Sequence, residues 1–138
     1  MRAFLPFMLL ASTLLIACGS DSDAGGVQTG PFRLLVYSQT DGFRHASIET
    51  GVETVRQLGL MHGFEVDHTE DPSAFTPHNL ARYAAVMWLS TTGDLLDADQ
   101  RSAFERYIAD GGGYAGVHSA SDTNYDWPFY GELVGAYF

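Results

Sequence analysis

The chain has 138 residues, of which 46% are apolar and 13% aromatic, enough for one packed domain and too few for two. Seven arginines, no lysine and seventeen acidic residues give a net charge of −10, so a nucleic-acid partner is not expected. The absence of lysine also excludes Schiff-base chemistry, a phosphate-loop lysine and a Ser-Lys dyad.

The first eighteen residues are predicted to be a targeting segment. Arg2 precedes an apolar run over 3–17, and its roughly 15 residues fall short of the ~20 that cross a bilayer. Leu15-Ile16-Ala17-Cys18 resembles the lipobox of bacterial lipoprotein signals. We therefore expect a signal peptide over 1–17, cleavage before Cys18 and lipidation of Cys18.

The product would be an exported bacterial lipoprotein of the cell envelope, facing the periplasm or the cell surface, and anchored to the membrane without spanning it.

Residues 18–30 are small, polar and poor in hydrophobic side chains, which is typical of a flexible tether. About 12 such residues have a reach on the order of 20 Å. The folded domain is expected over residues 31–138.

From residue 31 onward, strand-like apolar runs alternate with helix-like stripes. Strands are predicted over 33–38, 64–68, 84–89 and 114–117. A helix of about fifteen residues starts near Ile48 and ends at Gly63, a short helix follows Thr76-Pro77, and a third opens with the capping box of Asp97 and Gln100. This order predicts an α/β fold with a parallel sheet and a flavodoxin-like or Rossmann-like strand order. No Gly-x-Gly-x-x-Gly follows the first strand, so a dinucleotide site is not expected.

Polar side chains follow three of the predicted strands, over 42–45, 90–94 and 118–122. Because the carboxyl ends of parallel strands share one edge of a sheet, we expect these segments to form one crevice. In particular, His45, Asp94 and His118 are predicted to meet there.

Several chemistries remain open for this crevice. His118 is a candidate general base or metal ligand, or else a turn histidine bonded to backbone groups. His45 either joins it or caps a helix. Asp122 and Asp126 either complete a site for zinc or another divalent transition metal, or cap turns. Ser119 lies beside His118 and is a catalytic candidate with Asp122, although it stands one place late for a Gly-x-Ser-x-Gly elbow.

Candidate ligand contacts lie on the same segments. Arg44 is expected to pair with Asp94 or Asp122, or to hold a substrate oxygen. Hydroxyl and backbone N–H groups of Thr91 and Thr92 are candidates for binding an oxygen-rich ligand, or ordinary loop formers. The candidates for stacking on sugar faces are Tyr125, Trp127 and Tyr130, at least one of which is expected in the core. The remaining histidines, His62, His68 and His78, are expected to be solvated.

Three stretches of the chain resemble the ThuA-like (trehalose utilisation) domains: GFRHASI at 42–48, WLSTTGD at 88–94 and the segment 104–138. The fold of this family is similar to that of class I glutamine amidotransferases, a three-layer sandwich around a parallel sheet. Those enzymes carry Gly-x-Cys-x-Gly where this chain has Gly116-Val117-His118-Ser119-Ala120, so His118 replaces the nucleophilic cysteine. The resemblance therefore implies an α/β domain without cysteine amidotransferase activity.

The resemblance also implies a role in sugar utilisation, with keto-disaccharides or related glycosides as substrates. We expect a carbohydrate-processing protein of hydrolase or lyase type; the alternatives are a non-catalytic carbohydrate-binding module and an inactive fragment. ThuA-like domains continue beyond the part that this chain resembles, so the sheet is expected to be truncated. An open sheet edge would then favour aggregation.

Overall fold

The structure is a computed structural model that describes residues 31–138. The predicted signal peptide, the predicted lipidation site Cys18 and the predicted tether lie outside the described residues. Within the described part of the chain, no helix has the length and apolar character needed to cross a membrane.

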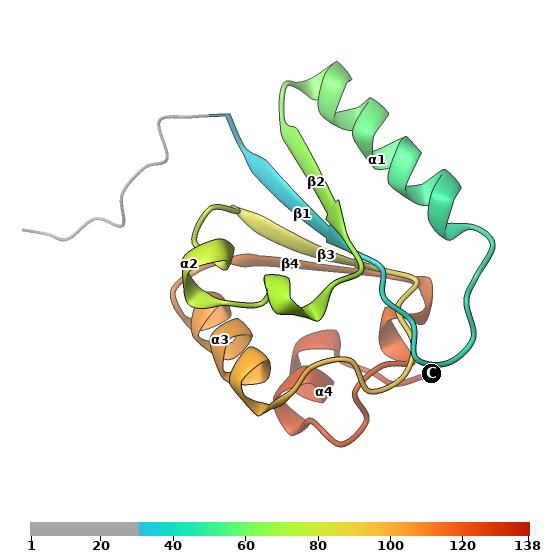
Figure 1. Cartoon of the computed structure of the whole chain (residues 1–138), viewed down its shortest axis with the longest axis vertical. Coiled ribbons are helices and arrows are strands. Elements are labelled where there is room, and N and C mark those ends of the chain that lie inside the picture. Colours follow the sequence, from blue (N-terminus) through green and yellow to red (C-terminus); the bar gives the residue numbers. More distant parts are fainter. Residues whose placement is uncertain (1–30) are drawn as a thin grey trace, which may run out of the picture.

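Four parallel strands form one sheet in the order β2-β1-β3-β4 (Figure 1). They are β1 (Arg33–Tyr37), β2 (Glu65–Thr69), β3 (Ala85–Leu89) and β4 (Gly113–Val117). The register pairs Val36 with His68 and Tyr37 with Trp88. This order matches the flavodoxin-like arrangement, so the predicted fold class is confirmed.

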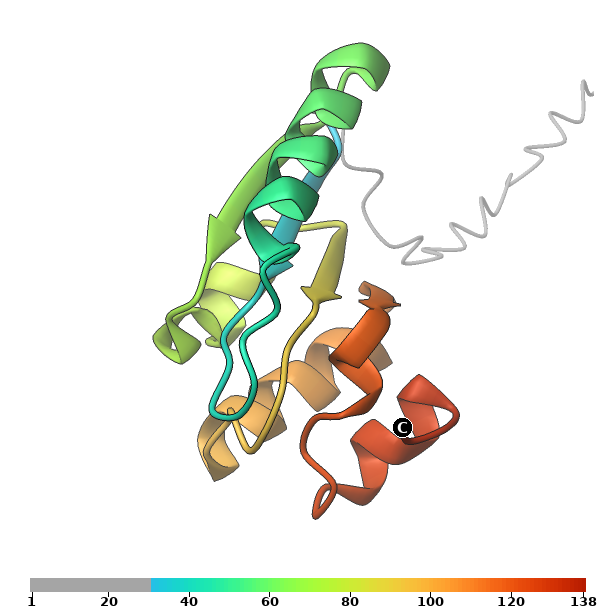
Figure 2. The ribbon, with the colours of Figure 1, turned by 90° about the vertical axis from the view of Figure 1, so that its right-hand side faces the viewer.

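Helices cover both faces of the sheet, as Figures 1 and 2 show. The helices are α1 (Ile48–His62), α2 (Pro77–Leu80), α3 (Ala98–Ala109) and α4 (Pro128–Val134), and two short 3₁₀ turns span Pro72–Ala74 and His118–Ser121. Helix α1 packs on one face, and α2, α3 and α4 lie on the other. The three layers expected from the sequence are therefore present.

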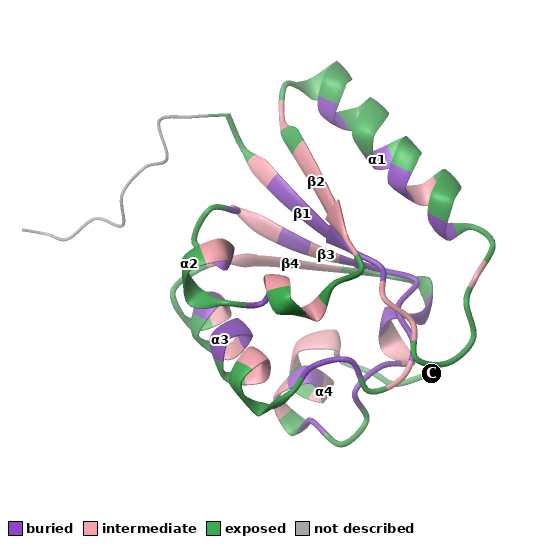
Figure 3. Cartoon of the chain, in the orientation of Figure 1, coloured by how far each residue is buried: buried purple, intermediate pink, exposed green. Residues whose placement is uncertain are grey.

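Each face of the sheet has its own apolar core, and β1 and β3 contribute to both. Under α1, the alternate residues Leu34 and Val36 of β1 pack against Val52 and Val55. On the opposite face, Trp88 is fully buried and contacts the rings of Phe104, Tyr130 and others. Buried residues are concentrated in β1 and β3, the two inner strands of the sheet (Figure 3).

Local capping signals set the helix ends that the sequence predicted. The Asp97 side chain accepts a hydrogen bond from the Gln100 backbone and the Gln100 side chain accepts one from the Asp97 backbone, which completes the capping box. Gly63 ends α1 in the left-handed conformation. The Thr76 side chain caps α2, whose first residue is Pro77.

The region after β4 differs from the expectation. The sequence predicted no helix after the last strand, but helix α4 starts at Pro128 and buries Tyr130 completely. The short helix after Thr76 starts at Pro77 as predicted but ends at Leu80, before Tyr83. Proline at the first helical position explains both starts, because its missing N–H has no partner to lose there.

Candidate functional site

The loops that follow β1, β3 and β4 lie side by side at the carboxyl edge of the sheet (Figure 2). Beyond the strand ends, Thr40 forms a parallel bridge with Thr92, and Gly93 forms one with Thr123. The three loops thus extend the strand order of the sheet. Gly93 permits this approach, because it has φ +87° and a side chain there would crowd Asp41.

Two of the predicted site residues meet in these loops. The ring centroids of His45 and His118 lie 4.4 Å apart in an edge-to-face arrangement. Phe43 packs on the other side of His45, at 4.9 Å. His118 is exposed and His45 is half-buried, so one imidazole is open to a ligand from solvent and the other lies behind it.

The backbone at His118 is strained. His118 directly follows β4 with φ +53°, and Ser90 directly follows β3 with φ +51°. Residues with a side chain rarely adopt this left-handed conformation, and such residues are concentrated at functional sites. The sharp turn lets the chain pass from β4 into the 3₁₀ turn over His118–Ser121 while the imidazole stays exposed.

Ser119 is buried, whereas the neighbouring His118 is exposed to solvent. The Ser119 side chain is 3% exposed, and its hydroxyl has no hydrogen-bond partner among residues 31–138. A buried hydroxyl does not reach a substrate without movement of the turn. The catalytic role predicted for Ser119 therefore stays a prediction that this geometry does not favour.

The carboxylates of the predicted site have partners other than the histidines. Asp94 and Asp126 both pair with Arg101, the latter at 3.0 Å. The hydrogen bond from Arg101 holds the pKa of Asp126 below its usual value. Asp122 accepts a hydrogen bond of 2.7 Å from the Tyr125 hydroxyl. The expected meeting of Asp94 with the two histidines is therefore replaced by an ion pair.

Arg44 pairs with carboxylates that the sequence did not single out. Its guanidinium lies 2.8 Å from Glu49 at the start of α1 and 2.9 Å from Glu70 after β2. The expected pairing with Asp94 or Asp122 was wrong, because residue 44 points toward α1 and β2, away from β4. Arg44 thereby ties the loop that carries His45 to both neighbouring elements.

Among the aromatic candidates, the structure separates core from surface. Trp127 is 4% exposed and its ring nitrogen donates to Glu105 at 2.7 Å, so the predicted sugar contact of Trp127 is not available. Tyr130 is buried and donates to the Ala120 carbonyl at 2.8 Å. Tyr125 is 53% exposed and packs against Tyr137 at 4.6 Å. Only Tyr125 of these three offers a ring face to a ligand.

Thr91 and Thr92 are buried, and their hydroxyls are used inside the protein. Thr91 bonds to Thr123, and Thr92 bonds to the loop that carries His45. The ligand contacts expected of these hydroxyls are thus replaced by loop contacts.

The residues present do not favour the metal hypothesis. Across residues 31–138, no group of three or more His, Cys, Asp or Glu side chains is placed to hold a metal ion. His45 and His118 form only a pair, because Asp122 and Asp126 bond to Tyr125 and Arg101. We assign no zinc or other cofactor to this pair.

Sequence reasoning missed two residues near the site. Arg101 donates to the Leu96 carbonyl and lies over the Trp127 ring. Its place in the first turn of α3 was the available signal, since a cation there opposes the helix dipole and calls for specific partners. His68 was expected to be solvated, but it is half-buried and lies 2.7 Å from the Ser38 hydroxyl. Burial lowers the pKa of His68.

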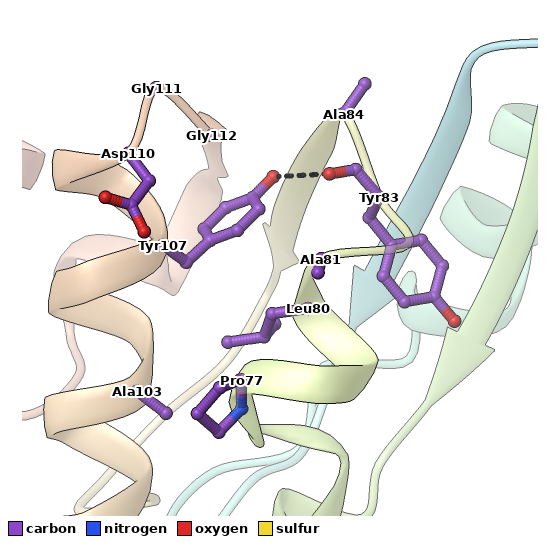
Figure 4. Close-up of a pocket in the computed structure, with 10 residues that line it drawn as sticks. All are labelled: Pro77, Leu80, Ala81, Tyr83, Ala84, Ala103, Tyr107, Asp110, Gly111 and Gly112. Atoms are coloured by element: carbon purple, nitrogen blue, oxygen red, sulfur yellow. Dashed lines mark hydrogen bonds between the residues drawn. The ribbon is translucent and has the colours of Figure 1, made fainter. Parts of the chain in front are cut away.

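A cavity lies at the opposite edge of the sheet. It measures about 480 Å³ and lies between α2 and α3, where Leu80, Ala103 and Tyr107 line it (Figure 4). The lining is mainly apolar and comes from the turns before β3 and β4. The cavity therefore does not include the histidine pair.

Comparison with known proteins identifies relatives of this chain. A family model described as "Trehalose utilisation" (ThuA) matches residues 33–138. A crystal structure of a ThuA-like protein from Bacteroides uniformis superposes with a TM-score of 0.63 at 27% identity. The match covers 81% of this chain and 47% of that protein, so the chain spans about half the length of that relative. Among curated proteins, no match was found.

Proposed function

Because the chain belongs to the ThuA (trehalose utilisation) family, we propose that it acts on a carbohydrate at the His45–His118 pair. The proposed substrates are trehalose-like disaccharides, their keto derivatives or related glycosides. The observation that carries the proposal is the contact of 4.4 Å between two imidazoles from different loops, one of them exposed on a strained turn.

Two adjacent imidazoles can move protons in both directions near neutral pH. In a keto-glycoside, a carbon next to the ketone carries an acidic C–H bond. If the neighbouring carbon bears the glycosidic oxygen, a neutral imidazole can take that proton. The electron pair then forms a C=C bond and expels the glycosidic oxygen, which takes a proton from the second ring in its protonated, imidazolium form. We assign the exposed His118 to the contact with substrate and His45 to the partner role.

Tyr125 supports the carbohydrate part of the proposal. Its ring is half-exposed, and its hydroxyl donates to Asp122, four residues after His118. Aromatic rings with a polar tip stack on the apolar faces of sugars while the tip keeps its hydrogen bond. Tyr125 is therefore the proposed sugar platform in the loop that follows His118.

A second candidate function is a carbohydrate-binding module without catalysis. The observation that favours it is the use of the nearby carboxylates elsewhere: Asp94 and Asp126 pair with Arg101, and Asp122 binds Tyr125. General bases of the histidine type commonly have a carboxylate or carbonyl that orients the ring. Such a module would bind sugar without converting it.

The substitution His118→Gln separates the two candidates. Trehalose and a keto-disaccharide are titrated by calorimetry, and product release is followed by chromatography. For an enzyme, His118→Gln abolishes turnover and leaves sugar affinity within a few-fold; for a binding module, no turnover is seen in either form and only affinity changes. The matched control is His78→Gln, which changes an exposed histidine of α2. Absence of both binding and turnover in the unchanged protein refutes the proposal.

We also propose that the chain is an exported lipoprotein anchored through Cys18. The proposal rests on the apolar run over 3–17 and on Leu15-Ile16-Ala17-Cys18. Mass spectrometry of the protein from its membrane fraction is expected to find an N-terminal acylated Cys18. A full-length chain with a free thiol contradicts it.

A further inference from the structure

We infer that Thr91 and Thr92 are positioning residues, which together hold His45 and His118 in contact. The inference rests on the proposed function of the histidine pair and adds the residues that set its geometry. Both threonines come after Ser90 in the loop that follows β3, the strand that lies between β1 and β4. The loop after β3 is therefore placed to contact both loops that carry a histidine.

Thr92 holds the loop that carries His45. Its hydroxyl donates to the Phe43 carbonyl at 3.0 Å and accepts from the Gly42 N–H at 3.3 Å. The Thr92 carbonyl also accepts from the Asp41 N–H at 2.8 Å. These three bonds fix the segment 41–43, which ends two residues before His45.

Thr91 holds the turn that carries His118 through a relay of two hydroxyls. The Thr123 hydroxyl donates its hydrogen to the Ser119 carbonyl at 3.2 Å, so Thr91 is the donor in the 2.9 Å contact with Thr123. Thr91 and Thr123 are fully buried. The relay ends on the residue next to His118.

Burial argues for positioning over ligand contact. Thr91 is 0% exposed and Thr92 is 2% exposed, and each hydroxyl already has a partner. Hydroxyl groups locate both loops without placing a charge beside the imidazoles. A valine in either position keeps the approximate shape of the side chain and removes only the hydrogen bonds of the hydroxyl group.

The test is the nuclear Overhauser cross-peak between the ring protons of His45 and His118, recorded on the purified full chain without sugar. Thr92→Val is expected to abolish this cross-peak, and Thr92→Ser to retain it, because serine keeps the hydroxyl. Thr91→Val is expected to abolish it as well. The matched control is Thr54→Val, since the exposed Thr54 hydroxyl bonds only to the Thr50 carbonyl of its own helix.

A second signal shows whether each variant is folded. The cross-peak between Trp88 and Tyr130, whose rings lie 4.7 Å apart in the core, must persist. If Thr91→Val does not fold, Thr123→Val interrupts the same relay and is expected to have the same effect. If Thr92→Val does not fold, retention of the histidine cross-peak in Thr92→Ala contradicts the inference. Retention of the histidine cross-peak in folded Thr91→Val and Thr92→Val overturns it.

The outcome is independent of any activity on sugar. The cross-peak tests only the geometry of the pair, whereas the calorimetry of His118→Gln tests what the pair does. If the protein binds no sugar but Thr92→Val still abolishes the cross-peak, the inference that the threonines position the histidines holds and the proposed function is refuted.

Discussion

The two edges of the sheet use the left-handed backbone conformation differently. At the edge where the strands begin, it is adopted by Gly63 and Gly111, in the turns before β2 and β4. At the edge where they end, Gly93 adopts it too, but so do Ser90 and His118, directly after β3 and β4. Glycine takes this conformation freely, whereas other residues pay roughly 1–2 kcal/mol. This conformational free-energy cost is present at Ser90 and His118, where a residue with a side chain occupies the turn.

The cavity between α2 and α3, of about 480 Å³, lies at the edge with the glycine turns, where the Tyr107 hydroxyl donates to the Tyr83 carbonyl (Figure 4). Its lining carries Asp110 as the only charged group. The strained backbone at Ser90 and His118 and the imidazole pair therefore identify the candidate site, and this cavity does not.

The largest expected effect is at the glycine edge. In Gly112→Ala, the new methyl group would overlap three atoms of the Tyr107 ring, so either the ring or the turn must move. We expect a loss of about 1–3 kcal/mol in the free energy of unfolding, measured by urea denaturation.

Gly111→Ala is the matched control for this effect. No atom lies within 4 Å of a methyl group there, so only the strain of φ +96° remains, at roughly 1 kcal/mol. Equal losses in the two variants would mean that the overlap with the Tyr107 ring costs no more than the backbone strain at residue 111.

The next effect tests the cost of the strained histidine. We expect His118→Gly to be more stable than His118→Ala by about 1 kcal/mol, because glycine relieves φ +53°. At His78, in the ordinary helical backbone of α2, the order is expected to reverse by about 0.5–1 kcal/mol. Thermal and urea denaturation of the four variants measure both differences. The same order at both positions would show that residue 118 carries no backbone strain.

The sequence predicted the elements of this fold better than the contacts of its site. Apolar periodicity and capping residues are local signals, and they located β1 to β4, α1 and α3 within one or two residues. The edge shared by parallel strands also predicted that His45 and His118 would meet. The partners of Arg44 and Asp94 depend on side-chain directions that no local pattern encodes. Asp94 pairs with Arg101 because α3 places this arginine between the loops that follow β3 and β4.

The partial burial of His68 was missed for a related reason. It follows from a neighbour in another layer, because α1 covers the face of His68. The sequence placed at least one of Tyr125, Trp127 and Tyr130 in the core but did not indicate which; α4 brings Tyr130 against Trp127 and buries both.

The smallest expected effect is on the pH dependence of the free energy of unfolding, and it differs between histidines at the two edges. His68 lies at the carboxyl edge beside Ser38 and Glu70, and burial lowers its pKa below the ordinary value of about 6.5 that the unfolded chain keeps. In the window between the two pKa values, the unfolded chain binds more protons than the folded one. The free energy of unfolding is therefore fully retained above about pH 6.5 and decreases as the pH falls through this window.

His68→Gln removes this titration and keeps a polar group next to Ser38. Its free energy of unfolding is expected to fall less between pH 7 and 5.5 than that of the unchanged protein, in urea denaturation at each pH. The effect is the smallest of the three because His68 is only half-buried, so solvent stabilises part of the charge. His78→Gln, which changes an exposed histidine, should leave the pH dependence as it is. A steeper fall in His68→Gln would mean that protonation of His68 stabilises the fold through Glu70, against the effect of burial.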